Sequence, residues 1–268
     1  MRFTKMEGLG NDYIYLNCLE GEPPDLPGLA RRLSRRHFGV GADGLICVRP
    51  GRTGDFTMEM YNADGSRGAM CGNGIRCVGK YVYDKGLTQK RCLTIDTDAG
   101  PRHLELLVAG GVVERVRVEM GEARVGRMVE LTAAGRSFSA LPVDVGNPHA
   151  VILLPSPREV EQTPLEELGP LLEHHPALGV RSNIGFAAPA DGALHLRVWE
   201  RGSGITLACG TGACAAFAAA WSRGLCGSRA VVHLPGGALT VEREGTGLIL
   251  EGPARTVFEG ETEGAEEG

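Results

Sequence analysis

Apolar and polar residues alternate along much of this 268-residue chain. Side chains of a β-strand point to opposite faces in turn, so alternation indicates strands that bury one face of a sheet. The clearest alternating segments are residues 55–61, 103–109, 112–120, 193–200, 229–234 and 239–244. We therefore expect β-sheet to dominate the fold.

Apolar residues recur at helical spacing in a smaller number of segments, which are residues 26–36, 74–85, 164–173 and 212–223. Pro164 opens its segment, a position that proline favours in helices. Segment 212–223 is apolar nearly all round and rich in small residues, so we expect a buried helix wrapped by sheet. These patterns predict an α+β fold of mostly antiparallel sheet with central helices.

The composition is that of a globular protein, with 43% hydrophobic and 23% charged residues. The net charge of −5 argues against nucleic-acid binding, and no apolar run is long enough to span a membrane. The N-terminus lacks the apolar region of a secretory signal. We expect a cytoplasmic protein whose eight cysteines are reduced, and the absence of a Cys-x-x-Cys pair predicts no metal site.

Two segments share a pattern centred on a cysteine. Asn62 precedes Cys71-Gly-Asn-Gly by nine positions, and Glu200 precedes Cys209-Gly-Thr-Gly by the same interval. A third pair of segments, Gly10-Asn11-Asp12 and Gly146-Asn147-Pro148, has nearly the same offset along the chain. We infer two related halves of about 130 residues, each large enough for its own core, that present one thiol each to a shared cleft.

The residues after each cysteine favour anion binding. A helix N-terminus leaves unpaired amides and carries a partial positive charge, and glycine lets an anion approach the backbone. The amides of residues 72–74 and 210–212 can therefore form nests for one carboxylate. The same dipoles are expected to lower each thiol pKa below its usual ~8.5. A generic tight turn or phosphate nest is the alternative, but a duplicated motif with a cysteine in both copies is far more specific.

Two thiols on opposite sides of one carbon can take a proton from one face and return it to the other. The pattern therefore indicates a racemase or epimerase with a thiolate as base and a thiol as acid. No lysine lies in the cysteine segments to form a Schiff base with pyridoxal phosphate. We expect no cofactor, because the helix termini can stabilise the developing enolate themselves.

Several motifs together resemble the diaminopimelate epimerase family. They are Lys5-Met-Glu-Gly-Leu-Gly-Asn-Asp12, Tyr61-Asn-Ala-Asp-Gly-Ser66, Cys71-Gly-Asn-Gly-Ile-Arg-Cys77, Gly146-Asn-Pro-His149, Arg181-Ser-Asn183 and the segment from Glu200 to Ala213. The resemblance implies cofactor-independent interconversion of LL- and meso-2,6-diaminopimelate in lysine and peptidoglycan precursor biosynthesis. It also implies two pseudo-symmetric domains, each a mostly antiparallel sheet around a central helix: residues 1–118 plus 254–268, and residues 119–253.

The resemblance assigns roles residue by residue. It implies Cys71 and Cys209 as the acid/base pair, Glu200 as an ammonium ligand, and His149 as a group that sets thiol protonation. Gly72, Asn73, Gly210 and Thr211 would hold the α-carboxylate of the reacting centre. The distal centre would be bound mainly by Asn11, Asn62, Asn147, Asn183 and Arg201. We expect a small-molecule partner, no nucleic acid and no membrane, and the sequence is compatible with a homodimer.

The chain departs from the family pattern at Glu7, where histidine is usual, and at Gly44, where some members carry a glutamine that contacts substrate. Any contact at residue 44 would have to come from the backbone. The remaining cysteines (18, 47, 77, 92, 214 and 226) are interpreted as small core residues. We also expect the link between the halves near residues 119–126 and a disordered acidic tail over residues 259–268.

Two other activities are compatible with the motifs. A proline or hydroxyproline epimerase would also use two cysteines, but its substrate would leave many of the polar groups unpaired. A thiol redox sensor or an anion-binding module is the other alternative. If the thiols flank one carbon, their sulfurs should lie roughly 6–7 Å apart, and mild oxidation should join them reversibly.

Overall fold

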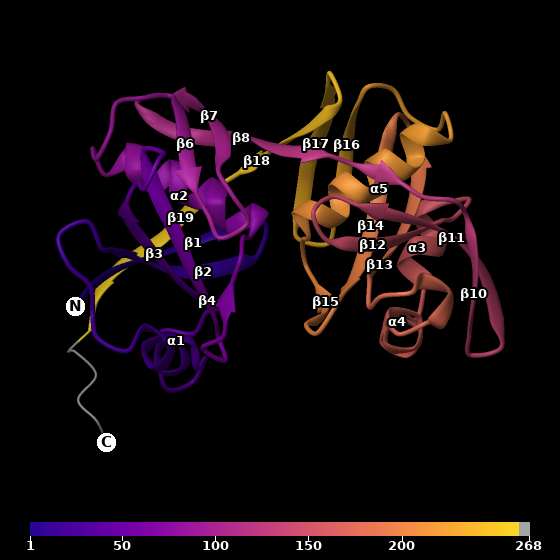
Figure 1. Ribbon diagram of the computed structural model, residues 1–268, viewed down its shortest axis with the longest axis horizontal. Helices are drawn as coiled ribbons and strands as arrows, with labels where there is room; N and C mark the ends of the chain where they lie inside the picture. Colours follow the sequence, from indigo (N-terminus) through magenta and orange to yellow (C-terminus); the bar gives the residue numbers. More distant parts are fainter. Residues whose placement is uncertain (263–268) are drawn as a thin grey trace. The chain divides into compact units, whose positions relative to one another are not determined.

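The computed structural model describes residues 1–262, and the chain divides into two compact units (Figure 1). The first unit contains residues 1–118 and the C-terminal stretch from residue 252, and the second contains residues 119–251. No helix among the described residues is long and apolar enough to cross a membrane.

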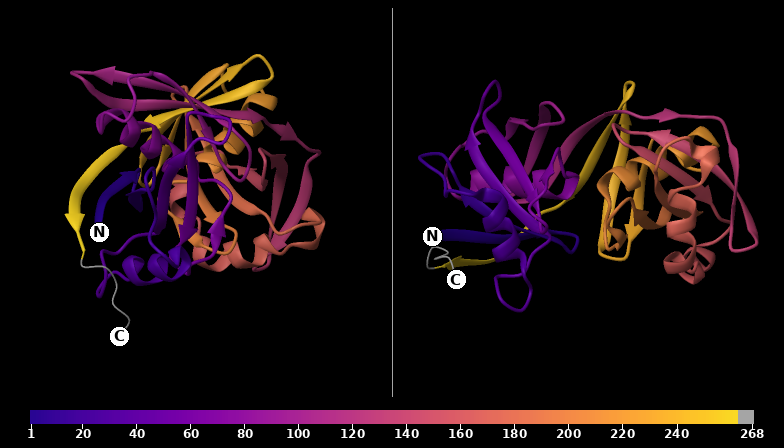
Figure 2. Two further views of the ribbon diagram at one scale, coloured as in Figure 1. Left: turned by 60° about the vertical axis from the view of Figure 1, so that its left-hand side comes forward. Right: turned by 60° about the horizontal axis from the view of Figure 1, so that its bottom comes forward.

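The first unit is a mixed sheet with two helices. Its strands are β1 (Arg2–Gly8), β2 (Asn11–Asn17), β3 (Gly44–Pro50), β4 (Phe56–Asn62), β5 (Arg67–Gly68), β6 (Cys92–Asp96), β7 (Arg102–Ala109), β8 (Val112–Glu122) and β19 (Arg255–Glu261). Its helices are α1 (Leu26–Ser34) and α2 (Gly72–Asp84). The strand order is β19–β1–β2–β3–β4–β6–β7–β8, in which β2–β3 and β4–β6 are parallel and the other neighbours antiparallel. Figure 2 shows β19 in yellow beside β1 in indigo, the pairing that brings the chain's end back to its beginning.

The second unit repeats this arrangement. Its strands are β9 (Arg124–Val125), β10 (Val129–Ala133), β11 (Arg136–Asp144), β12 (Pro148–Leu153), β13 (Asn183–Ala190), β14 (Ala193–Glu200), β15 (Gly204–Thr206), β16 (Arg229–Leu234), β17 (Gly237–Glu244) and β18 (Gly247–Pro253). Its helices are α3 (Pro157–Gln162), α4 (Leu165–Glu173), the 3-10 turn η1 (Pro176–Leu178) and α5 (Gly210–Ser222).

The order of neighbours in the second unit is β10–β11–β12–β13–β14–β16–β17–β18, with β12–β13 and β14–β16 parallel and the rest antiparallel. This is the same succession of pairings as in the first unit. The equivalent helices, α2 and α5, each follow a short strand that pairs with the strand before it. The two halves are therefore structural repeats, and the fold is the α+β arrangement that the sequence predicts.

The central helix of each unit is buried against its own strands. Helix α5 contacts β11–β14 and β17, and every residue from Ala213 to Ala220 is buried. Helix α2 packs on β1, β2, β7 and β19, where a Cβ added to Gly79 would lie 2.9 Å from Leu106. Small residues let helix and sheet approach closely, which explains why alanine and glycine fill these helices.

The structure corrects several expectations. The chain passes from the first unit to the second at residues 118–119, where the link over residues 119–126 was expected, but this segment holds the end of β8 and β9. Residues 259–261 of the predicted disordered tail pair with β1 as part of β19, while residues 263–268 lie outside the described range. Cys92 is exposed at the start of β6 and Cys226 is half-buried, so neither is the core residue expected. Cys18, Cys47, Cys77 and Cys214 are buried as expected.

Candidate active site

Cys71 and Cys209 occupy the same place in their units, immediately before a helix. Each is the N-cap residue in extended conformation, with φ and ψ of −131° and 121° at Cys71 and −125° and 110° at Cys209. Cys71 Sγ accepts a hydrogen bond from the amide of Gly74 at 3.4 Å, and Cys209 Sγ accepts one from Gly212 at 3.3 Å. The helices were expected to begin at residues 74 and 212, but they begin at 72 and 210, so each sulfur lies at the helix terminus itself.

Side chains from β2 and from the loop before β3 surround Cys71. Its thiol donates to Asn11 Oδ1 at 3.2 Å, and Asn11 Nδ2 donates to Asp43 Oδ2 at 2.8 Å. The phenol of the buried Tyr13 interacts with both Asn11 and Cys71. Burial, with the nearby Cys71 and Asp43 adding to it, raises the pKa of Tyr13 well above its ordinary value. Tyr13 is therefore a neutral hydroxyl beside the thiol.

The first turn of α2 is fixed from within the unit. Asn73 is buried and its Oδ1 accepts from Arg76 Nη2 at 2.9 Å. The fully buried Arg76 also donates from Nη1 to Gly72 O at 3.0 Å and from Nε to Pro253 O at 3.2 Å. This guanidinium thus holds the segment expected to bind a carboxylate, and it adds a positive charge there.

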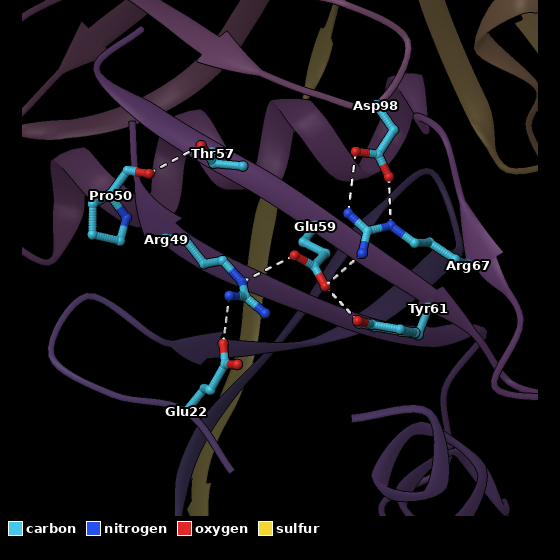
Figure 3. A network of polar contacts seen from close by, with 8 residues as sticks. All are labelled: Glu22, Arg49, Pro50, Thr57, Glu59, Tyr61, Arg67 and Asp98. Carbon is cyan, nitrogen blue, oxygen red and sulfur yellow. Dashed lines mark hydrogen bonds and ion pairs between the residues drawn. The ribbon is translucent and has the colours of Figure 1, made fainter. Parts of the chain in front are cut away.

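The segment between Asn62 and Cys71 is anchored by a network of ion pairs, drawn in Figure 3. Arg67 in β5 binds Glu59 Oε1 at 3.0 Å through Nη1 and Asp98 Oδ2 at 2.5 Å through Nε. Glu59 also binds Arg49 at 3.0 Å and accepts a hydrogen bond from Tyr61. Asn62 Nδ2 donates to Ser66 Oγ at 2.9 Å across the turn. The network thus fixes the turn that carries Asn62.

Cys209 lies in a more enclosed setting than Cys71. Its side chain is buried, and Sγ lies 3.5 Å from Thr211 Oγ1. Glu200 interacts with the thiol and accepts from Thr206 Oγ1 at 2.5 Å. Burial and the charge of Glu200 raise the pKa of Cys209 well above its ordinary value, and they outweigh the hydrogen bonds from Thr211 and the Gly212 amide. The expected lowering of this thiol's pKa is therefore wrong for the free protein.

His149 reaches Cys209 through other side chains. Its Nε2 lies 3.1 Å from Asn147 Oδ1, Asn147 Nδ2 donates to Thr211 Oγ1 at 3.4 Å, and Thr211 contacts the sulfur. Burial lowers the pKa of His149 to about 4, so the imidazole is neutral at physiological pH. The chain of contacts gives His149 an indirect connection to the thiol.

Asn183 and Arg201 are held together at the start of β13 and the end of β14. Asn183 Oδ1 accepts a hydrogen bond from the backbone amide of Arg201 at 2.9 Å, and Asn183 Nδ2 donates one to Pro148 O at 3.0 Å. Arg201 is exposed, and its Nη1 donates to Arg181 O at 3.4 Å. Asn183 is buried, so in this structure it orients its neighbours.

The repeat identifies equivalent positions that the sequence reasoning missed. In the parallel pairs, Tyr13 lies opposite Gly44 and His149 lies opposite Asn183. Tyr13 is thus the counterpart of His149, and both are buried near their unit's cysteine. A Cβ at Gly44 would lie 2.1 Å from Tyr61 O, so no side chain fits there. Arg76 and Thr206 lie within the motifs of the family resemblance, whereas Tyr13 and Asp43 do not, and the contacts of all four depend on the fold.

No cluster of three or more His, Cys, Asp or Glu side chains suited to a metal ion occurs among residues 1–262.

Comparison with known proteins identifies the family of this chain. The family model described as diaminopimelate epimerase matches residues 3–126 and 141–257. The chain belongs to the diaminopimelate epimerase family.

Full-length relatives agree with this family assignment. The chain is 44% identical to the diaminopimelate epimerase of Acetivibrio thermocellus, with 98% of this chain and 99% of that protein covered. It is 43% identical to the diaminopimelate epimerase of Methanococcus maripaludis, with 97% and 99% covered.

Solved structures extend the likeness of fold beyond this family. A probable proline racemase from Agrobacterium radiobacter matches with a TM-score of 0.75 at 17% identity, covering 98% of this chain and 93% of that chain. A PhzF-family phenazine biosynthesis protein from Bacillus anthracis matches with a TM-score of 0.74 at 15% identity, covering 98% of both chains. At such identities the matches concern the fold alone.

Proposed function

We propose that this protein interconverts LL- and meso-2,6-diaminopimelate, with Cys71 and Cys209 as the two acid/base groups. One observation carries the proposal: each repeat places a cysteine as the N-cap of its central helix, with the sulfur bonded to the helix's own amides. Full-length similarity to diaminopimelate epimerases supports the choice of substrate and of the lysine pathway. The proposal includes a cytoplasmic location, because the thiols must stay reduced to act.

The proposed mechanism requires one thiolate and one thiol on opposite faces of the α-carbon. The thiolate removes the α-proton, the electron pair passes into the α-carboxylate as an enolate, and the opposite thiol protonates the carbon. The amides of Gly72, Asn73, Gly210 and Thr211 are proposed to bind that carboxylate, where both helix termini stabilise its added negative charge.

The surroundings of Cys209 bear on how it would ionise. Cys209 is buried beside Glu200 and is therefore held as the thiol in the free protein. Glu200 is proposed to bind the substrate's α-ammonium group, and such a cation would offset the carboxylate charge that opposes a thiolate at Cys209. Substrate binding would thus make it easier for Cys209 to ionise to the thiolate, the form that acts as base in the reverse direction.

The remaining polar residues are proposed to bind the distal amino-acid centre. Arg201 offers a fork suited to a carboxylate, and amide side chains both donate and accept. Asn11, Asn62, Asn147 and Asn183 contribute such amides. His149 is proposed to tune Cys209 through Asn147 and Thr211. A homodimer remains part of the proposal.

Proton NMR of LL-diaminopimelate in heavy water, with no added cofactor, tests the function. We expect loss of an α-proton signal and formation of the meso isomer. Cys71→Ser and Cys209→Ser should each reduce turnover by roughly a thousandfold, the scale of a lost acid/base group, while Cys92→Ser should not. Exchange of proline instead of diaminopimelate, or unchanged turnover in both serine variants, would contradict the proposal.

A further inference from the structure

Asp43 lies at the centre of the contacts around Cys71. It directly precedes β3, and its Oδ2 accepts from Asn11 Nδ2 at 2.8 Å and from the amide of Asp12 at 3.2 Å. Its Oδ1 accepts from Arg36 Nη2 at 3.0 Å. The carboxylate therefore binds the start of β2 through both a side chain and the backbone.

The backbone of Asp43 connects the same segments. Its amide donates to Asp12 O at 2.8 Å, and its carbonyl accepts from Ala63 N at 3.0 Å. Ala63 follows Asn62 in the turn toward Cys71. One residue thus joins the strand that carries Asn11 to the turn that carries Asn62.

The bond from Asp43 decides which end of the Asn11 amide faces Cys71. Because a carboxylate only accepts, it binds the NH2 group of Asn11 and leaves the carbonyl oxygen toward the sulfur. Asn11 Oδ1 lies 3.2 Å from Cys71 Sγ, and an oxygen acceptor bonds a thiol but not a thiolate. If Asn11 turned over, its NH2 group would favour the thiolate instead.

We propose that Asp43 is a positioning residue that fixes Asn11 with its carbonyl toward Cys71 and so favours the thiol form of Cys71 in the free protein. This orientation is a property of the first unit alone. Only its consequence for turnover rests on the proposed epimerase function. In that function Asn11 binds the substrate instead of the Cys71 thiol, and Cys71 can then ionise.

Other ionisable groups of the first unit also act on Cys71 or lie beside Asp43. Tyr13 and Tyr15 from β2 and Arg76 and Cys77 from α2 interact with the thiol or with each other. Burial raises the pKa of both phenols and raises that of Cys77 to about 12, so these three groups are neutral at neutral pH. Burial lowers the pKa of Arg76, whose guanidinium starts from a far higher ordinary value and stays charged in proteins. The Arg76 charge favours the thiolate. Asp12 and Arg36 face Asp43, and Lys5 pairs with Asp12 at 2.6 Å.

The pH dependence of Cys71 alkylation by iodoacetamide tests the proposal without any substrate. Trypsin releases residues 68–76, a peptide in which Cys71 is the sole cysteine, so its labelling can be quantified by mass spectrometry. Asp43→Ala frees Asn11 to turn, and we expect the labelling midpoint to fall by about one pH unit, a tenfold gain in thiolate fraction. Asp43→Asn can still accept from Asn11 through its amide oxygen and should keep the wild-type midpoint.

These variants separate positioning from charge. If Asp43 acted by its negative charge, Asp43→Asn would shift the midpoint as far as Asp43→Ala, and the proposal would be overturned. In an Asn11→Ala background, Asp43→Ala should have no further effect on the midpoint. An undiminished shift in that background would also overturn the proposal.

A matched control addresses general destabilisation. Asp96 accepts backbone hydrogen bonds from Arg52, Thr53 and Gly54 at 2.7–3.0 Å, and none of its bonds reaches Asn11 or Cys71. Asp96→Ala should leave the midpoint unchanged. Should Asp43→Ala fail to fold, Asn11→Ala alone must lower the midpoint, and an unchanged value would refute the proposal.

Turnover provides a second readout. We expect Asp43→Ala to lower kcat/KM for diaminopimelate by roughly tenfold, the scale of one hydrogen bond to an ionisable group, with Asp43→Asn restoring most of it. An inactive wild-type protein would count against the proposed function and leave the alkylation result intact. An active wild type with equal midpoints in all variants would refute the role of Asp43 alone.

Discussion

At the scale of single residues, the two thiols share a position but differ in their surroundings. The sequence predicts both cysteines and the nests after them, because Cys-Gly-x-Gly is a local pattern. It cannot predict that Glu200 approaches the buried Cys209 and raises its pKa, because that contact depends on how β14 and β15 pair. The same holds for Tyr13 and Asp43, whose neighbours come from other strands.

His149 should make the stability of the second unit depend on pH. Its pKa is lowered from an ordinary 6.5 to about 4 by burial, so the unfolded chain binds more protons between these values. Its contribution is present above pH 6.5 and is lost as pH falls toward 4. We expect about 2 kcal/mol of unfolding free energy to be lost between pH 7 and 5 on this account.

Urea denaturation of His149→Gln at pH 7 and pH 5 measures this term. Between pH 7 and pH 5, the loss of unfolding free energy should be about 2 kcal/mol smaller in the variant than in the wild type. His174→Gln, at an exposed histidine, is the control and should behave like the wild type. Equal pH dependence of wild type and His149→Gln would contradict a buried neutral imidazole.

At the scale of elements, the helices that carry the cysteines were predictable and their first residues were not. The apolar patterns of α2 and α5 mark their bodies, but the Gly-x-Gly turns look like loops until the N-cap bonds are seen. Strands β2 and β3 escaped prediction because their buried residues form runs without alternation, as is usual for strands covered on both faces.

The first turn of α5 leaves little room beside the Cys209 sulfur. A Cβ at Gly212 would lie 3.1 Å from Cys209 Cβ and 3.2 Å from its Sγ. We expect Gly212→Ala to displace the sulfur and lower kcat by roughly tenfold to a hundredfold, as misplaced reacting atoms do.

Gly74→Ala is the matched variant in α2, since its Cβ would meet the flexible ends of Ile46 and Met58 and lie 3.5 Å from Cys71 Cβ. Its loss of kcat should be clearly smaller. Steady-state kinetics of both variants make the comparison, and a larger loss for Gly74→Ala would contradict the steric explanation.

Breaking the ion-pair network of Figure 3 should lower the free energy of unfolding. Glu59 is buried between Arg49 and Arg67, so Glu59→Ala leaves both guanidinium groups without this partner. We expect the unfolding free energy to fall by about 2–3 kcal/mol, less than for a fully buried pair because Arg67 is partly exposed. Glu105→Ala removes a more exposed pair with Arg117 and should cost under about 1 kcal/mol. Equal losses of unfolding free energy for Glu59→Ala and Glu105→Ala in urea denaturation would contradict a stabilising role of the network.

At the scale of the whole molecule, the duplication was visible in the sequence and its physical form was not. The offset of Cys71 and Cys209 predicts two halves, and the structure gives both halves one succession of parallel and antiparallel pairings. The chain changes units at residues 118–119, at the start of the expected link, but the sequence did not show that strand β8 continues across this boundary. The family resemblance placed residues 254–268 with the first half, whereas the pairing of β19 with β1 leaves no local signal in the sequence.

Two thiols acting on one carbon should also be open to oxidation. Without substrate, mild oxidant is expected to join Cys71 and Cys209 and abolish activity, and dithiothreitol should restore it. Mass mapping of the linked peptides identifies the bond. Retained activity after oxidation, or loss that dithiothreitol does not reverse, would contradict this expectation.

The most direct test of the two-thiol account is the position of deuterium in the first turnovers in heavy water. The cysteine that removes the α-proton then carries protium, and it can return only protium to that face of the carbon. The opposite cysteine has exchanged with solvent and delivers deuterium to the other face. Starting from LL-diaminopimelate, early meso product should carry deuterium at the inverted carbon while the remaining substrate keeps protium. Deuterium entering the remaining substrate as fast as product forms, or product that retains the original protium, would contradict the account.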